Sequence, residues 1–457
     1  MCYDKNKKGE NIMQIKNITK LIFTIMIVVL CFSCNSTKTY AQTESYSIEE
    51  LEGYYKTQGR TAVVDDTLML DFSASGMEFR ADCEGDVYVE INSIMATSYP
   101  TGGLYFTVVV DGKVQAEDLR IPEDNHADNW TSNSTGYPFH ITDMNKKVEF
   151  KIAEGLEKGE HTFGIYRQNE PVEGKFGVSA IKFDGELLDP PAEKDLYFEF
   201  IGDSILAGYG NLSRGGTHAA LYQDATRGWA YLVSQEMDAD WSLIAHSGIT
   251  AANGIGWSGK SSVSMQKMYP LQRYHSDRKT LYSFDREPDV IFVCLGTNDI
   301  WTYQTSDPSN TTEVVSDGIK EMTQLIREKN PNAKIVWLYN MMTYGANMLI
   351  DKAIKEMGGE EKGLYTLMLE TNLKGGGEHP DLATQTVYAD SICKFLKETI
   401  KIEELAQSEQ NGADSDANEK DIDMTWVYPV VVAIVVVAMV LVGRQIWMKR
   451  NKQNTES

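Results

Sequence analysis

Two patterns of hydrophobic and polar positions divide the middle of the chain. From about residue 46 to residue 190, β-branched and aromatic runs partly alternate with polar residues, and Asp-Gly and Lys-Gly turns separate them. The clearest runs are VYVEINSI (87–94), LYFTVVVDG (104–112), KVEFKIAEG (147–155), HTFGIYRQ (161–168) and GVSAIKFDG (177–185). Such alternation predicts half-buried strands, and many short strands without helices are typical of a jelly roll. We therefore expect an all-β sandwich domain over residues 46–190.

A different pattern begins after the short linker Pro190-Pro191. Strand-like runs at 194–202, 241–248, 288–296 and 333–341 alternate with helical stretches at 227–238, 312–329 and 381–400. In the stretch 312–329, the apolar residues Val315, Ile319, Met322 and Ile326 recur at the spacing of one helix face. This alternation predicts a doubly wound α/β domain with a mainly parallel sheet over residues 194–402. Such sheets bind ligands at the carboxyl ends of their strands.

Both ends of the chain carry apolar runs. The run at 21–32 is too short to span a membrane comfortably, and Lys16 and Lys20 precede it, so we expect a secretory signal peptide over residues 1–41. Residues 425–443 are nineteen uncharged, mostly apolar residues, which is enough for a transmembrane helix. Four basic residues follow in 444–457. By the positive-inside rule this tail is cytoplasmic, and everything before the helix is extracellular and anchored to the cell membrane.

Composition narrows the possible partners. Apolar residues at 42% and charged residues at 24% are ordinary for folded protein, but the net charge of −23 argues against nucleic acid and acidic lipid surfaces. The segment 403–423 holds eight acidic residues and one Lys, so we expect a disordered, extended stalk. Three cysteines remain after the predicted cleavage, and buried free thiols are the favoured interpretation for Cys83, Cys294 and Cys393. No spacing suggests a metal site or a cofactor.

Four segments at predicted strand or helix boundaries carry candidate chemistry. They are Gly202-Asp203-Ser204, Ser247-Gly248, Gly296-Thr297-Asn298-Asp299 and His379-Pro380. Each segment is a weak signal alone, but the occurrence of all four in this order is improbable by chance. Acyl transfer explains the residue types: Ser204 serves as nucleophile once His379 accepts its proton, and donors must meet the oxyanion that forms. The backbone N–H groups of Ser204 and Gly248 and the side-chain amide of Asn298 supply three such donors.

These residues resemble the SGNH (GDSL-type) hydrolases, whose four letters match Ser204, Gly248, Asn298 and His379 in order. The motifs FIGDSILAGYG and CLGTND carry the resemblance over roughly 194–402. The chain is most similar to carbohydrate esterases of family two, which place a β-sandwich domain before the esterase domain. The resemblance implies a flavodoxin-like α/β fold and removal of O-acetyl groups from plant-type polysaccharides such as xylan or glucomannan.

One position departs from the wider superfamily. An Asp usually lies three residues before the histidine, and this chain has Gly376 there. Some family-two esterases look like Ser–His dyads in which a backbone carbonyl orients the ring, and Gly377 is placed to supply that carbonyl. Glu378 and Asp381 are alternative partners, but a side chain so near in sequence seldom folds back correctly. We favour the dyad.

The neighbouring polar and aromatic residues allow two interpretations each. Asp203 tunes the nucleophile or, as we favour, hydrogen-bonds the turn backbone, and Asp299 is expected to brace the loop that carries Asn298. We expect His246 to be a structural histidine at a strand end. Trp301 either stacks on a sugar face or simply packs against the protein.

The leading hypothesis is a membrane-anchored extracellular carbohydrate O-acetyl esterase that acts through an acyl-serine intermediate on an acetylated polysaccharide or oligosaccharide. A lipase or thioesterase of the same superfamily is one alternative. The other is a non-catalytic surface protein that binds carbohydrate, which only the absence of the Asp supports.

Overall fold

The computed structural model describes residues 44–95, 104–116, 137–143, 145–171, 174–213, 222–256, 259–260, 263–274, 277–306, 311–342 and 347–402. They form two compact units: a β unit, with the described residues up to Ala192 and those of 212–226 and 270–283, and an α/β unit with the others. The predicted signal peptide (1–41), stalk (403–423), membrane helix (425–443) and basic tail (444–457) lie outside the described residues. Among the residues described, no helix is long and apolar enough to span a membrane.

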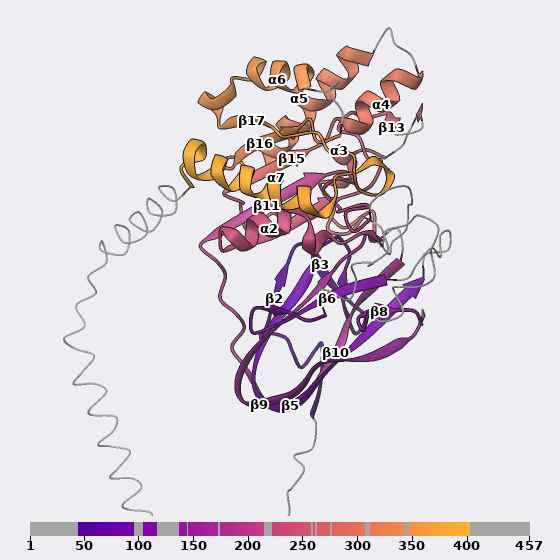
Figure 1. The fold of residues 1–457 in the computed structure, drawn as a ribbon, viewed down its shortest axis with the longest axis vertical. Coiled ribbons are helices and arrows are strands. Elements are labelled where there is room, and N and C mark those ends of the chain that lie inside the picture. Colours follow the sequence, from indigo (N-terminus) through magenta and orange to yellow (C-terminus); the bar gives the residue numbers. More distant parts are fainter. Residues whose placement is uncertain are drawn as a thin grey trace, which may run out of the picture. The chain divides into compact units, whose positions relative to one another are not determined.

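The β unit is an antiparallel sheet, as the alternating pattern predicted (Figure 1). Its strands are β1 (Glu44–Ser47), β2 (Tyr55–Gln58), β3 (Thr61–Val64), β4 (Thr67–Leu70), β5 (Gly76–Met95), β6 (Leu104–Val110), β7 (Lys113–Val114), β8 (His140–Ile141), β9 (Lys147–Arg167) and β10 (Gly174–Leu188). Hydrogen bonds join all ten into one sheet, with β3-β4-β10-β5-β9-β6-β7 as the main path. The antiparallel β-rich domain expected before the α/β domain is confirmed, and its arrangement as a jelly-roll sandwich stays a prediction. The long strands β5, β9 and β10 run through register shifts, which allow a strand to bend without ending.

Two arginines organise the interior of the β unit. Arg167 is fully buried and donates to the carbonyl oxygens of Leu70, Asn169, Glu170 and Gly174 at 2.6–3.1 Å. Arg60 donates to the carbonyl of Leu271 at 2.8 Å, and its guanidinium lies 4.1 Å from the ring centre of Tyr282. A buried charge is costly unless its hydrogen bonds are made. The contacts of the two guanidinium groups therefore hold the contacted backbone in place. Arg60 thereby attaches the segment 270–283 to the β unit.

The α/β unit contains the predicted parallel sheet. Its strands are β11 (Leu196–Gly202), β12 (Ala239–Ala245), β15 (Val290–Cys294), β16 (Lys334–Tyr339) and β17 (Leu364–Met368), in the order β12-β11-β15-β16-β17 and all parallel. This is the flavodoxin-like strand order. The pair β13 (Ile255–Gly256) and β14 (Gly259–Lys260) forms a small separate hairpin. The sequence did not predict β17, because its five residues LYTLM are half-exposed and show no clear pattern.

Helices cover the parallel sheet (Figure 1). The α-helices are α2 (Trp229–Glu236), α3 (Met265–Met268), α4 (Thr297–Ser306), α5 (Thr311–Lys329), α6 (Asn347–Glu356) and α7 (Leu382–Phe395). Shorter turns are the 3-10 segments η5 (Ala225–Arg227), η6 (Gly359–Lys362) and η7 (Gly376–Glu378) and the π-helical turn η8 (Leu396–Ile400). Helix α2 packs on α7, and α5 packs on α3, α4 and α6. Helices α2, α5 and α7 lie within or beside the three predicted helical stretches, whereas α3, α4 and α6 were not predicted.

Aromatic packing holds the centre of the sheet. Strands β11, β12 and β15 are buried along their whole length, as expected for a parallel sheet covered on both faces. Phe200 of β11 stacks on Phe292 of β15 with ring centres 5.1 Å apart, and Trp229 of α2 meets the Phe200 ring edge-on at 5.5 Å. This cluster fixes the spacing of β11 and β15, whose carboxyl ends carry Asp203 and Asn298.

Replacing Phe292 with Ala should therefore cost about 3–5 kcal/mol of unfolding free energy, because it leaves a cavity between two central strands. Met348 on α6 is 82% exposed, so Met348→Ala is the matched control and should change stability by less than about 0.5 kcal/mol. Urea denaturation followed by far-UV circular dichroism at the helix band measures both. Equal midpoints for the two variants would contradict the packing account.

Candidate active site

The carboxyl edge of the parallel sheet collects the four candidate segments. Ser204 follows β11, Gly248 follows β12, and Asn298 lies in the first turn of α4, just after β15. His379 lies between η7 and α7. Because parallel strands end at one edge, residues far apart in sequence meet there.

Ser204 and His379 are in direct contact. The Nε2 atom of His379 lies 2.7 Å from Oγ of Ser204, and both residues are 9% exposed. The other ring nitrogen, Nδ1, lies 2.8 Å from the carbonyl oxygen of Gly377. A carbonyl can only accept, so Nδ1 carries the hydrogen and Nε2 is left to accept the serine hydroxyl proton. The pair therefore has the arrangement of a nucleophile and its base.

The backbone before His379 is built from glycines. Gly377 and Glu378 both adopt left-handed conformations, with φ of 61° and 60°. The N–H of Gly376 donates to the carbonyl of Gly210 at 2.9 Å. Gly210 itself has φ of 67°, and a Cβ on it would lie 2.3 Å from the carbonyl oxygen of Gly376. This close approach requires glycine at 210, and it holds the turn that presents the Gly377 carbonyl to the ring.

The two alternative carboxylate partners of His379, Asp381 and Glu378, do not bond its ring. Asp381 caps helix α7, where its Oδ1 accepts the backbone N–H of Thr384 at 3.1 Å and the hydroxyl of the same residue at 2.5 Å. Within the described part of the chain, neither Asp381 nor Glu378 forms a hydrogen bond to the His379 ring. The ring of Tyr209, a residue that sequence reasoning missed, lies 4.8 Å from the His379 ring. An aromatic neighbour of this kind leaves no pattern in the sequence.

Asp203 and Asn298 form a buried polar pair. Asp203 accepts the N–H of Ile205 at 3.0 Å, the kind of turn contact that the sequence favoured, and its other oxygen accepts from Nδ2 of Asn298 at 3.1 Å. The same Nδ2 also donates to the carbonyl of Ile249 at 3.0 Å. Sequence reasoning missed both contacts of Asn298. Because both amide hydrogens point at protein acceptors, Asn298 acts as an oxyanion donor only if one hydrogen is shared with the substrate.

Gly248 lies in the turn that follows β12. Its φ is 77°, a left-handed conformation that glycine adopts without strain. The N–H of Ile249 donates to the carbonyl of His246 at 3.3 Å, and Nδ1 of His246 lies 2.7 Å from the carbonyl of Ser247. His246 therefore contacts the turn backbone, as a structural histidine does. Gly248 is joined to the Asp203–Asn298 pair through its neighbour Ile249.

Asp299 braces two loops. Backbone N–H groups of Gly296 and of Asp299 itself favour its charged form, so it contacts the loop that carries Asn298, as expected. Its two oxygens also accept the N–H groups of Ala251 at 3.0 Å and Ala252 at 2.8 Å, which was not expected. Asp299 has no exposed surface, and this burial raises its pKa to about 6 although the backbone N–H groups favour the charged form.

The remaining predictions concern Trp301 and the three cysteines. Trp301 of α4 is 53% exposed, one turn after Asn298. Cys83, Cys294 and Cys393 are free and buried, as predicted, and burial raises the pKa of all three thiols. No group of His, Cys, Asp and Glu side chains in the described ranges has the geometry to hold a metal ion.

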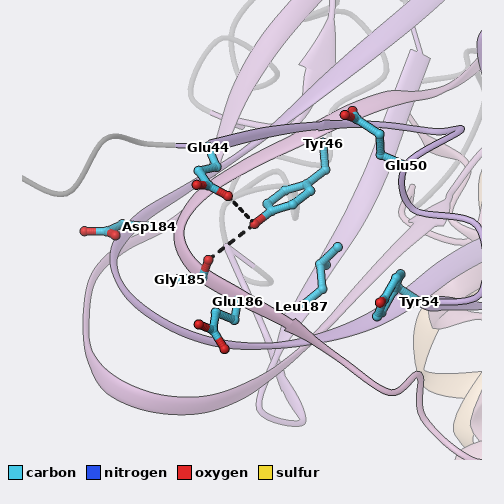
Figure 2. A pocket seen from close by; sticks show the side chains of 8 residues that line it. All are labelled: Glu44, Tyr46, Glu50, Tyr54, Asp184, Gly185, Glu186 and Leu187. Carbon is cyan, nitrogen blue, oxygen red and sulfur yellow. Dashed lines mark hydrogen bonds between the residues drawn. The ribbon is translucent and has the colours of Figure 1, made fainter. Parts of the chain in front are cut away.

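A hollow in the β unit lacks this chemistry (Figure 2). It is lined by Glu44, Tyr46, Glu50, Tyr54, Asp184, Gly185, Glu186 and Leu187. The hydroxyl of Tyr46 lies 2.7 Å from Glu44 and 3.3 Å from the carbonyl of Gly185. None of these described lining residues is a serine, cysteine or histidine, so the candidate active site is the carboxyl edge of the parallel sheet.

Known proteins are similar to this chain in sequence and in fold. Residues 200–381 match the GDSL-like Lipase/Acylhydrolase family. The chain is 26% identical over 275 residues to the Cellulase/esterase CelE of Acetivibrio thermocellus, covering 57% of this chain and 32% of that protein. It is 28% identical over 166 residues to an Acetylxylan esterase / glucomannan deacetylase of Cellvibrio japonicus, covering 34% of this chain and 44% of that protein. The chain thus spans less than half the length of these curated relatives.

A solved structure is similar as well. The acetyl xylan esterase Est2A from the rumen bacterium Butyrivibrio proteoclasticus matches with a TM-score of 0.66 and 18% identity, over 79% of this chain and 99% of that one. At this identity the match shows the fold. Together the matches confirm the resemblance inferred from the motifs. Residues 200–381 thus resemble the GDSL-like Lipase/Acylhydrolase family, and the curated proteins that the chain is similar to bear the names of carbohydrate-active esterases.

Proposed function

We propose that this protein is an extracellular carbohydrate O-acetyl esterase that uses Ser204 and His379 as a catalytic dyad. The observation that carries the proposal is the 2.7 Å contact between Nε2 of His379 and Oγ of Ser204, with Nδ1 held at 2.8 Å by the carbonyl of Gly377. Since that carbonyl fixes the tautomer, the base is ready before substrate arrives.

The proposed reaction has two halves. In the first, Oγ of Ser204 attacks the acetyl carbonyl carbon while Nε2 of His379 takes the hydroxyl proton. The oxyanion of the tetrahedral intermediate faces the N–H groups of Ser204 and Gly248 and the amide of Asn298. Collapse breaks the bond to the sugar oxygen, which leaves as a hydroxyl with the proton from His379. In the second half, water attacks the acetyl-serine with His379 again as base, and acetate leaves.

In the proposed dyad, the dipole of a backbone carbonyl takes the place of the carboxylate found in a triad. In a triad an Asp both orients the histidine and stabilises the imidazolium that forms. Here the Gly377 carbonyl takes the orienting role, and its negative end also favours the charged ring, though less than a full charge does. Position 376, where the superfamily usually has Asp, instead packs against Gly210.

The substrate class is supported by the relatives and by charge. One curated relative bears the name acetylxylan esterase / glucomannan deacetylase. The backbones of xylan and glucomannan are chains of neutral sugars. A chain with a net charge of −23 favours such a neutral glycan over a polyanion. The exposed indole of Trp301, one turn after Asn298, offers a flat apolar face for a sugar ring.

The proposed location rests on the sequence. A signal peptide over 1–41 exports the chain, the helix over 425–443 retains it in the cell membrane, and the acidic stalk over 403–423 holds the catalytic part away from the surface. The tail over 444–457 then stays in the cytoplasm.

Removing the nucleophile tests the chemistry. Ser204→Ala should lower kcat for an aryl acetate and for acetylated xylan by more than about 10⁴-fold, because no other group attacks the ester. Ser391 on α7, whose hydroxyl bonds the Val387 carbonyl at 2.8 Å, gives the matched control Ser391→Ala, expected to be fully active. If Ser204→Ala retains activity while circular dichroism shows an intact fold, the assignment of Ser204 is wrong.

Neutralising the two nearby carboxylates tests the dyad. Glu378→Gln and Asp381→Asn should each keep kcat within about tenfold of the wild-type value, whereas loss of a triad carboxylate costs about 10⁴-fold. Asn is itself a good helix cap, so Asp381→Asn keeps the start of α7. Steady-state kinetics with an aryl acetate measures both variants. A 10³-fold loss in either one would assign that carboxylate to His379.

Charges in the proposed membrane helix test the location. The double variant Val435→Arg/Val436→Arg places two guanidinium groups at the centre of the segment, each costing about 2.5–3.5 kcal/mol of insertion free energy. Esterase activity should move from the membrane fraction to the medium, while Gln453→Arg/Asn454→Arg in the tail leaves it with the membrane. Release of the wild-type protein to the same extent would refute the anchor.

A further inference from the structure

One buried ionisable side chain beside the site has no part in the reaction just described. Asp299 has no exposed surface, and its two carboxylate oxygens accept the N–H groups of Ala251 and Ala252 at 3.0 and 2.8 Å. Its sequence neighbour Asn298 donates to the carbonyl of Ile249 at 3.0 Å. Two consecutive residues at the start of α4 thus hold the segment 249–252 by three hydrogen bonds, and this segment follows Gly248 directly.

We propose that Asp299 is a positioning residue that fixes the segment 249–252, so that the N–H of Gly248 and the amide of Asn298 face the same oxyanion. The inference rests on the proposed ester hydrolysis. Asp299 acts through the backbone that it holds and touches no reacting atom. A shift of a donor by a fraction of an ångström weakens the stabilisation of the oxyanion, because the donor must already point at the charge that forms.

Other contacts hold the same segment from outside. The hydroxyl of Thr250 donates to the carbonyls of Ala252 and Ile255 at 3.0 and 2.8 Å, and the N–H of Met265 donates to the carbonyl of Thr250 at 2.9 Å. A Cβ on Gly318 of α5 would lie 2.4 Å from Cβ of Ala252, so the helix backbone packs closely on the segment. With these contacts in place, loss of the Asp299 carboxylate loosens the segment without unfolding it.

The energetic cost of Asp299 favours a functional role over a purely structural one. Burial raises its pKa to about 6, against an ordinary value of 3.8. Between these two values the folded protein keeps a proton that the unfolded chain has released, so the contribution of Asp299 to stability falls as pH rises through this range. At neutral pH the ionised carboxylate therefore costs folding free energy, as groups kept for function often do.

The test compares Asp299→Asn with Asp240→Asn in the full chain. Asp240 is a matched control because it is also buried and also accepts a backbone N–H, from Lys194 at 2.9 Å, together with Nη1 of Arg286 at 2.6 Å. It lies near the amino end of β12, at the opposite edge of the sheet. Asp299→Ser, which keeps one small acceptor, serves as a second variant should the first fail to fold.

Three readouts are expected to move together in Asp299→Asn. The kcat for an aryl acetate falls about 10- to 100-fold with KM within threefold. The inhibition constant of a boronic acid that forms a tetrahedral adduct on Ser204 rises by the same factor. Hydrogen exchange of the amides of 248–252 speeds up at least tenfold. Asp240→Asn changes the melting temperature but none of these three.

The outcomes separate this inference from the proposed function. If kcat and the exchange of 248–252 match the wild type in a folded Asp299 variant, Asp299 does not position the donors and the inference is overturned. If the wild-type protein hydrolyses no ester, the proposed function fails instead, and the exchange data alone decide whether Asp299 holds the segment.

Discussion

The hydrogen bond from Nδ1 of His379 to the carbonyl of Gly377 is the contact on which the candidate site depends. It decides which ring nitrogen carries the hydrogen, and so leaves Nε2 as the acceptor that faces Ser204 at 2.7 Å. A carbonyl two residues before the histidine can reach the ring only if the intervening backbone turns sharply. Gly377 and Glu378 make that turn in left-handed conformations, and the close contact between Gly210 and Gly376 holds it in place.

This construction links the serine and histidine loops through the backbone. Gly210 lies six residues after Ser204, and Gly376 lies three before His379. Their contact therefore couples the position of the nucleophile loop to that of the base. A side chain at Gly210 would separate the two loops. The glycines around position 376, where the wider superfamily usually has Asp, thus have a structural role of their own.

Much of this arrangement was predictable from the sequence. The parallel-sheet unit follows from the alternation of strands and helices, and the joint order of Ser204, Gly248, Asn298 and His379 follows from strand ends that share one edge. Strand β17 escaped prediction because a short, half-exposed segment carries little periodicity. Helix α6 was missed although it is amphipathic, with Ile350, Ala353 and Ile354 buried on one face. The contacts of Asn298 with Asp203 and Ile249, and of Asp299 with Ala251 and Ala252, escaped prediction for another reason. They join groups that are brought together only by the tertiary fold.

The two buried aspartates show how such a site tolerates charge. In the proposed reaction a negative oxygen forms near Ser204, so uncompensated carboxylates close by would oppose it. Asp203 is compensated by the N–H of Ile205 and the amide of Asn298, and Asp299 by the N–H groups of Ala251 and Ala252. Each carboxylate thus orders a loop that carries a proposed oxyanion donor, and all but one of the dipoles named here are backbone N–H groups. Because those dipoles are oriented before substrate arrives, little reorganisation is required when the oxyanion forms.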